Sequence, residues 1–221
     1  MAITLSTGAT VSVAKTYSPA LGSAGVANTA LTNANPCVVS SAGHTLSIGD
    51  YVQMSSGWGL LDQRVVRVQA VSAGVSFTLE GVDTSDTSKY PAGTGTGSHR
   101  EITAWSQLSQ VKSVSASGGA QQFADITSIA DTVIRQIPTV KDAVNMTIDV
   151  FDDPTLAWYA DVVAADTART PYGLLMTFPN GSKLVANSYW SIMKVPTMET
   201  NQALMSQITL SYAAEPLRYA T

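Results

Sequence analysis

The sequence is poor in the residue types on which most catalytic and metal-binding chemistry depends. Its 221 residues include one cysteine, Cys37, and two histidines, His44 and His99. A single cysteine excludes an internal disulfide framework, and no group of His, Cys and carboxylate residues has the spacing of a metal site. No strand–turn–helix nucleophile elbow surrounds a serine. We therefore expect no catalytic residue, no metal site and no cofactor, and we interpret both histidines as solvated loop residues.

Charge is also scarce. Charged residues make up 13% of the chain, about half of the ~25% that is typical of a soluble domain. The formal net charge is -4, and no basic segment provides the electrostatic footprint of a protein that binds nucleic acid tightly. Such a surface belongs either to a monomer covered by neutral polar groups or to a subunit that is largely buried against other subunits.

Long apolar runs are missing as well. No stretch of about 18 apolar residues occurs, so we expect no membrane insertion. Residues 1–7 lack a basic region followed by an apolar run, so we expect no secretory signal. Together with the lone thiol, this predicts synthesis in a reducing cytoplasm.

The first half of the chain shows short β patterns. Residues 1–33 are rich in small polar residues and predict an N-terminal arm with a first strand. Residues 34–98 predict a small β domain, in which Val75, Phe77 and Leu79 alternate with polar residues. The Gly-Thr-Gly-Thr-Gly stretch that ends at Gly97 lacks the spacing of a phosphate-binding loop, and we interpret it as the linker that leaves this domain.

The second half, residues 99–221, predicts longer strands and one helix. Met146, Ile148 and Val150 alternate with polar residues, as in a half-buried strand. Asp153 is expected to cap a helix that Pro154 begins and that runs to about residue 168.

The same half contains a hairpin signal and a helix face. Asn180-Gly181 between two β-like runs predicts a hairpin with a type I′ turn. The spacing of Leu156, Tyr159 and Val163 predicts the buried face of the helix. The expected fold is mainly β: an antiparallel sandwich with one flanking helix and a C-terminal tail, plus the small domain at residues 34–98.

Acidic residues concentrate between Trp105 and Thr170. This stretch contains eight acids and four bases, which accounts for the whole net charge of the chain. One interpretation is a solvated acidic face. The other is a surface past which DNA slides without sticking, because Lys and Arg contacts to phosphates are what retain DNA.

An ordered series of segments in the second half resembles the major tail tube proteins of long-tailed phages of the lambda type. The resemblance covers residues 105–216 and rests on the order of its pieces, none of which is specific alone. Thr139 departs from the glycine that often follows Ile-Pro in such proteins. The pieces are Trp105–Lys112, Phe123–Ser128, Arg135–Asp142, Asn145–Phe151, Leu156–Tyr159, Thr177–Ser182, Trp190–Met193, and a strand that ends in Tyr212 and Pro216.

The resemblance implies a structural virion protein. Six copies would close into a ring with an inner β-barrel, and rings would stack into a tail tube through which DNA passes, with residues 34–98 on the exterior. Tape-measure and tail terminator proteins are the implied partners, the virion tail the location, and the host cytoplasm the place of assembly. The implied inter-ring loop carries Asp125, Asp131, Arg135, Lys141 and Asp142, and the candidates for the channel wall are Asp149, Asp161 and Asp166.

Three alternatives stay open at this stage. A carbohydrate-binding or fibre-associated adhesion module would use Trp58 or Trp190 as sugar platforms, although both serve equally well in a core. A tube of a secretion apparatus would share the architecture. A hydrolase would need a constellation around His44 or His99 that the sequence does not display.

Overall fold

A computed structural model describes residues 7–220 of the chain, so the first six residues of the predicted N-terminal arm lie outside the described part. The fold is mainly β, as predicted, with one helix, α1 (Ala157–Ala168). The strands are β1 (Thr10–Ser18), β2 (Val26–Asn28), β3 (Ala30–Leu31), β4 (Val38–Ser40), β5 (Tyr51–Ser56), β6 (Val65–Ser72), β7 (Ser76–Leu79), β8 (Gly97–Leu108), β9 (Val111–Ser117), β10 (Gln121–Asp125), β11 (Gln136–Lys141), β12 (Asn145–Phe151), β13 (Tyr172–Thr177), β14 (Lys183–Ile192), β15 (Met205–Tyr212) and β16 (Leu217–Tyr219).

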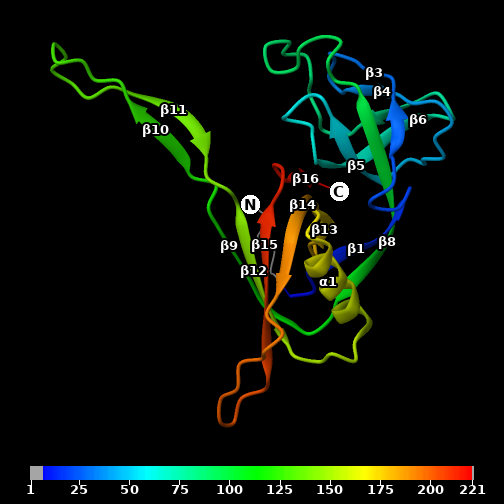
Figure 1. The fold of residues 1–221 in the computed structure, drawn as a ribbon, viewed down its shortest axis with the longest axis vertical. Helices are drawn as coiled ribbons and strands as arrows, with labels where there is room; N and C mark the ends of the chain where they lie inside the picture. The colour runs from blue at the N-terminus through cyan, green and yellow to red at the C-terminus, as the bar shows by residue number, and fades with distance from the viewer. Residues whose placement is uncertain (1–6, 221) are drawn as a thin grey trace.

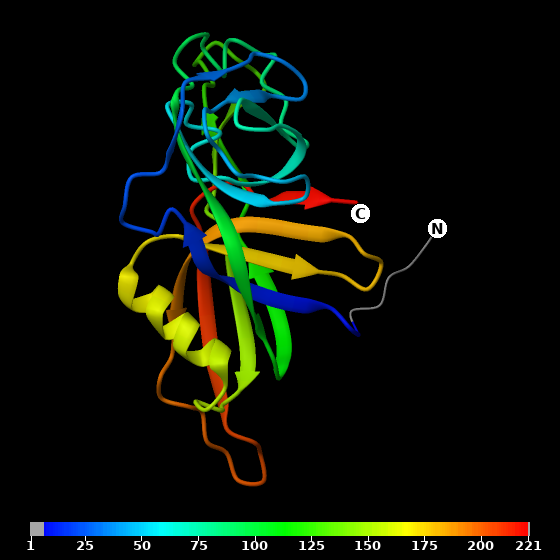
Figure 2. The same cartoon turned by 90° about the vertical axis from the view of Figure 1, so that its right-hand side faces the viewer.

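Most strands belong to one strongly bent antiparallel sheet. Its order is β3-β4-β7-β6-β5-β8-β1-β13-β14-β15-β12-β9, with β2 and β16 attached to β8 and β14. The sheet turns so far that β1, β13 and the first part of β14 run across the direction of β15, β12 and β9 (Figure 2). Strands β10 and β11 form a separate two-stranded arm that leaves the body of the molecule (Figure 1).

The larger core lies between α1 and the bent sheet. Met146, Ile148 and Val150 of β12 point into it, as their alternation predicts, and meet Trp158 and Val162 of the helix. The indole Nε1 of Trp158 donates a hydrogen bond to Ser109 Oγ at 3.1 Å. One face of β12 and β15 is thereby covered, while the other stays open.

The helix begins later than predicted. Its N-cap is Leu156, which makes no side-chain capping hydrogen bond. Asp153 instead accepts hydrogen bonds from the backbone N and the hydroxyl of Thr155, which lower the pKa of its carboxyl group. The Asp153 carboxylate therefore forms an Asx turn with Thr155 and does not cap a helix that begins at residue 154.

The buried face of the helix also differs from the predicted one. Trp158, Val162 and Ala165 are buried, whereas Tyr159 and Val163 are only partly covered. The later start of the helix does not explain this difference, because it leaves the angular positions of the residues around the helix axis unchanged. Trp158 determines which face of the helix is buried, because its large side chain offers more apolar area to the core than its neighbours do.

The predicted hairpin is present, but its turn is different. Strands β13 and β14 pair from Tyr172 with Ser188 to Thr177 with Lys183. Gly181 N donates to Phe178 O at 2.9 Å, and only Gly181, not Asn180, has a positive φ, 81°. This is a three-residue loop that ends in a left-handed glycine, which suits a proline at its first position better than a type I′ turn does.

A second core fills the region of the predicted small domain. It gathers Val39, Met54, Trp58, Phe77 and Leu79 from β4, β5, β7 and the loop that follows β5. This region is continuous with the rest of the sheet, because β8 pairs with β5 through residues 97–102 and with β1 through residues 101–108. The boundaries at residues 34 and 98 stay a prediction.

Both histidines belong to this core, contrary to their interpretation as solvated residues. His99 is 2% exposed and lies edge-on to Phe77, with 4.8 Å between ring centroids. Its Nδ1 is 2.7 Å from Asn28 Oδ1. His44 is 6% exposed and meets the same phenyl ring at 5.5 Å. Flanking Gly and Ser residues had suggested loops, but β8 extends to Gly97 and carries His99 inward.

The glycine-rich stretch is packed and is not a free linker. A Cβ on Gly95 would lie 2.7 Å from the indole of Trp58, and a Cβ on Gly97 would collide with the backbone oxygen of Ser55. Trp58 Nε1 donates to Pro91 O at 2.9 Å, which fixes this loop over the ring. The glycines are therefore required by close backbone approach.

We expect Gly97→Ala to lower the free energy of unfolding by about 2 kcal/mol or more, because the backbone of β5 must move to admit a methyl group. Gly59→Ala is the matched control, since a Cβ there meets nothing within 4 Å. Urea unfolding of both variants measures the difference. Equal stability of the two would contradict the close approach of β5 and β8.

The C-terminal strand packs on its own chain. Strand β16 pairs with β14, and the Tyr219 hydroxyl accepts a hydrogen bond from Arg67 N at 2.9 Å. Tyr219 is buried, and Leu217 contacts the second core. Residues 217–219 thus bind the two halves of the chain together.

Candidate assembly surfaces

The open face of β9, β12, β15 and β14 carries a regular array of side chains, most of them small and polar. Strand register aligns them in three rows across the sheet. We call this array the hydroxyl face; its rows are Ser117–Asn145–Ser211–Tyr189, Ser115–Thr147–Thr209–Ser191 and Ser113–Asp149–Gln207–Met193.

Asp149 is the one charged residue in these rows. Its carboxylate accepts hydrogen bonds from Ser113 Oγ at 2.7 Å and Gln207 Nε2 at 3.2 Å. These bonds run along the row and hold the carboxylate against the sheet. The three rows are therefore rich in hydroxyl and amide groups and carry a single charge, and Lys112 and Glu199 stand beside the last row.

The other two channel candidates lie elsewhere. Asp161 and Asp166 are on α1, which covers the opposite face of the same strands. Asp161 forms an ion pair with Lys15 of β1 at 3.4 Å. Because the sheet separates the helix from the hydroxyl face, Asp149 cannot share one wall of a channel with Asp161 and Asp166.

Strand β9 forms one edge of the large sheet. It pairs with β12 and with no other strand among residues 7–220. Its side chains are exposed from Lys112 to Ser117. An edge of this length offers unpaired backbone donors and acceptors to a strand of another chain.

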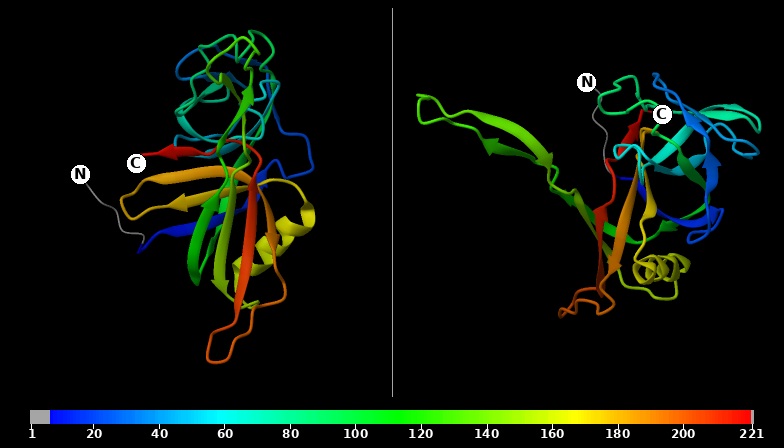
Figure 3. Two further views of the ribbon diagram at one scale, coloured as in Figure 1. Left: turned by 90° about the vertical axis from the view of Figure 1, so that its left-hand side faces the viewer. Right: turned by 45° about the horizontal axis from the view of Figure 1, so that its top comes forward.

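The β10–β11 arm projects away from the body of the molecule (Figure 3). It also exposes apolar side chains. Ile129 at its tip is fully exposed, and Val133 and Ile134 beside it are 70% and 72% exposed. Farther along the arm, Phe123, Ile126, Ile137 and Val140 are exposed as well. Several exposed apolar side chains on one projecting arm are unusual for a free surface and make the arm a candidate for a protein–protein contact.

The five charged candidates of the inter-ring loop are all on this arm or at its base. Asp125 accepts from Thr127 N at 2.8 Å, and Asp131 pairs with Arg135 at 3.5 Å near the tip. At the base, Lys141 pairs with Glu215 at 3.5 Å, and Asp142 accepts from Gln122 Nε2. Each of these charged groups thus has a hydrogen-bond or ion-pair partner within the chain. The exposed apolar side chains of the arm are the groups that nothing in the described part of the chain covers.

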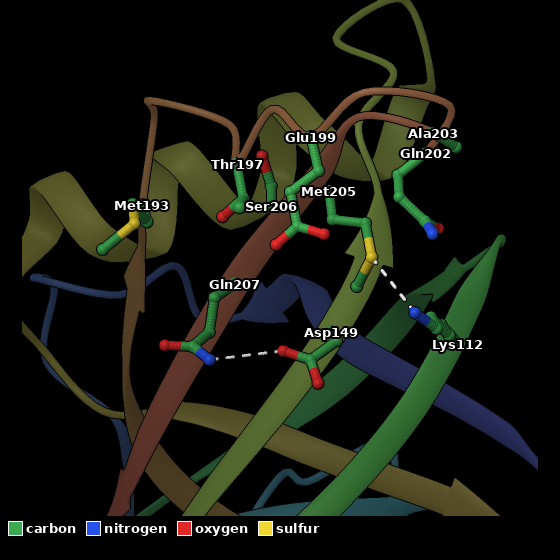
Figure 4. A pocket seen from close by; sticks show the side chains of 10 residues that line it. All are labelled: Lys112, Asp149, Met193, Thr197, Glu199, Gln202, Ala203, Met205, Ser206 and Gln207. Carbon is green, nitrogen blue, oxygen red and sulfur yellow. Dashed lines mark hydrogen bonds between the residues drawn. The ribbon is translucent and has the colours of Figure 1, made fainter.

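A pocket lies at the other end of the strands, beneath the loop that joins β14 to β15. Its volume is about 410 Å³, and Lys112, Met193, Thr197, Ala203 and Met205 are among the residues that line it (Figure 4). The loop also exposes Val195, Met198 and Leu204. Asp149, Gln207 and Met193 of the last row of the hydroxyl face also line this pocket.

The residues that the adhesion alternative would use are buried. Trp58 is 1% exposed, and Trp190 donates from Nε1 to Tyr172 O at 3.3 Å within the larger core. Neither indole presents a face on which a sugar could stack. Within residues 7–220, no three His, Cys, Asp or Glu residues gather as a metal site would require, and no helix there is both long and apolar enough to cross a membrane.

The sequence analysis did not predict the apolar tip of the arm or the exposed apolar residues of the β14–β15 loop. A signal was available: residues 123–140 carry apolar residues without the helix period and without a clear partner strand. The predicted contact residues of that segment were its charged ones, which the structure pairs within the chain.

Comparison with solved structures finds partial similarity to proteins of injection systems. The baseplate structure of the anti-feeding prophage matches with a TM-score of 0.40 and 8% identity, covering 53% of this chain and 85% of the other. The tube-terminating cap of the same prophage matches at 0.38 and 19%, covering 52% and 83%. The sheath–tube complex of an extracellular contractile injection system matches at 0.37 and 16%, covering 48% and 80%.

A comparison with curated protein sequences finds no match. The family model described as phage tail tube protein matches residues 56–221. This match extends the resemblance of the second half upstream, into the predicted small domain. It spans well over half of the chain, and so the chain belongs to the phage tail tube protein family, whose members are structural components of the tail and not enzymes.

Proposed function

We propose that six copies of this chain close into a ring, that rings stack into the tail tube, and that the hydroxyl face lines the channel through which DNA passes. The observation that carries the proposal is the composition of this face, where Asp149 is the one charge in three rows of polar side chains. DNA is retained by Lys and Arg contacts to its phosphates. A wall of hydroxyl groups with a weak negative charge lets DNA slide.

The β9 edge supports ring closure. A neighbouring copy that pairs with this edge would extend the sheet from subunit to subunit, and a closed ring leaves no edge exposed. The low charge of the chain agrees with this role, because much of its surface would be buried between copies.

The position of the small domain is consistent with the tube exterior. Residues 34–98 and α1 lie on the same side of β12 and β15, away from the hydroxyl face (Figure 1). Insertions on that side would leave the channel unobstructed. We further propose tape-measure and tail terminator proteins as partners, with assembly in the host cytoplasm.

Negative-stain electron microscopy of the purified chain, before and after concentration and mild heating, tests the architecture. We expect six-fold rings or hollow tubes. The same grids are prepared with a tail terminator protein added, because nucleation by a partner would suppress spontaneous assembly. Single particles of about 23.1 kDa under all of these conditions would contradict the proposal.

A further inference from the structure

We propose that the C-terminal strand β16 is a latch that holds the small domain against the body of the molecule, and that the small domain turns on strand β8 when this latch is released. The body is the part built around the larger core. Strand β16 lies between the small domain and β14 (Figure 2). All parts of this device belong to one chain, so it goes beyond the proposed tube and does not depend on assembly.

Strands β5 and β6 of the small domain are covered on both faces. Val52, Met54 and Val66 point into the second core. On the other face, Tyr51 and Val65 are the buried apolar residues of these strands that meet the body. Because alternate residues of a strand point to opposite faces, this second face is the contact between the small domain and the body. Its apolar part is small.

The same contact contains three amide side chains that satisfy one another poorly. Gln63 Oε1 accepts hydrogen bonds from Gln53 Nε2 at 3.4 Å and from Asn187 Nδ2 at 3.5 Å, which are long distances. Gln53 Oε1 and Asn187 Oδ1 are buried and have no hydrogen-bond partner within residues 7–220. Such atoms oppose burial, because water would satisfy them once the contact opened. This face by itself therefore holds the small domain weakly.

Strand β16 supplies the contact that this face lacks. Leu217 packs against the second core and also against the cluster that contains Tyr51. The Tyr219 hydroxyl accepts a hydrogen bond from Arg67 N at 2.9 Å, and the Arg67 guanidinium lies 4.5 Å from the centroid of the Tyr219 ring. The backbone of β16 pairs with residues 183–185 of β14. One short strand thus joins the two parts, with its side chains on the small domain and its backbone on the body.

Strand β8 provides the hinge, because both halves of the sheet share it. It pairs with β5 from Gly97 to Ile102, and its pairing with β1 shifts register twice between Ala14 and Tyr17, opposite residues 102–105. Irregular pairing of this kind bends a strand locally. Neither this bend nor β16 contains a residue of the three rows of the hydroxyl face. The small domain can therefore turn while the rows keep their register.

The distance between two spin labels tests the latch in the purified chain. Cys37→Ser removes the one native thiol, and Ile48→Cys and Thr167→Cys place labels at exposed positions of the small domain and of α1. We expect one narrow distance distribution while β16 is intact. Tyr219→Ala should widen the distribution at least about two-fold, because the small domain then samples a range of orientations about its hinge.

Arg218→Ala is the matched control. Arg218 belongs to the same strand, but its guanidinium lies over the ring of Phe178 in the β13–β14 hairpin, 4.8 Å from the centroid. This variant should keep the narrow distribution. A distribution that stays narrow in Tyr219→Ala, or that Arg218→Ala widens equally, would overturn the latch.

Thiol labelling of the native Cys37 distinguishes a small domain that turns from one that unfolds. Cys37 is buried in the second core, so we expect it to react with a maleimide as slowly in Tyr219→Ala as in the unmodified chain. Labelling that is at least about ten-fold faster would show that the second core itself opens, and it would overturn the latch. Neither measurement needs rings or tubes, so a failed latch leaves the tube proposal intact, and a chain that forms no tubes leaves the latch intact.

Discussion

Phage particles whose tail tubes carry Thr209→Lys are expected to assemble normally and to release their DNA at least ten-fold more slowly. Thr209 lies in the middle row of the hydroxyl face and is exposed. In the proposed ring of six, the substitution would add six ammonium groups to the proposed channel wall. Contacts to about 6–10 phosphates already make binding to DNA strongly salt-dependent, and every ring of the tube would repeat them.

The measurement is the rate of DNA ejection from particles at two salt concentrations. The delay should shrink as salt rises, because screening weakens the lysine–phosphate contacts. Thr167→Lys is the matched control: it makes the same chemical change on an exposed position of α1, on the other side of the sheet. Equal ejection rates for the two variants would contradict the assignment of the hydroxyl face to the channel.

The second large effect concerns acid. Burial lowers the pKa of His99 from its ordinary 6.5 to about 4, and the nearby His44 contributes further. The folded chain therefore keeps this imidazole neutral where the unfolded chain protonates it. Stability is fully present above pH 6.5 and falls as the pH drops toward 4. The expected loss by pH 4 is about 3 kcal/mol of the free energy of unfolding.

Urea unfolding at several pH values between 7 and 4.5 checks this expectation. Asp86, whose pKa is lowered to about 2, also contributes stability that is lost on acidification, but that loss occurs at lower pH, outside this window. His99→Gln should remove most of the pH dependence whatever its own stability. His44→Gln keeps His99 and its burial, the larger cause of the lowered pKa, and should retain most of the pH dependence. An unchanged slope in His99→Gln would show that the loss has another source.

The sequence alone determined the fold class and the family. The features that predicted the fold depend on residues adjacent in sequence, because strand period, turn geometry and solvation act on neighbouring residues. They are the alternation in residues 145–150, the Pro-Asn-Gly turn before β14 and the scarcity of charge. The same locality led to the right hairpin with the wrong turn. Local pattern also predicted a helix cap at Asp153, whereas in the structure the Asp153 carboxylate accepts hydrogen bonds from Thr155.

Only the tertiary structure decided which residues share a surface. Asp149 and Asp161 are close in sequence, yet they lie on opposite sides of the sheet. Alternate residues of β12 point to opposite faces, so Asp149 points to the open face, whereas α1, which carries Asp161, packs on the other face. His99 is buried because β8 crosses from one core to the other, which no local pattern indicates. The apolar tip of the arm and the pocket beneath the β14–β15 loop lie at opposite ends of paired strands, and this placement depends on strand register, a property of contacts between distant residues.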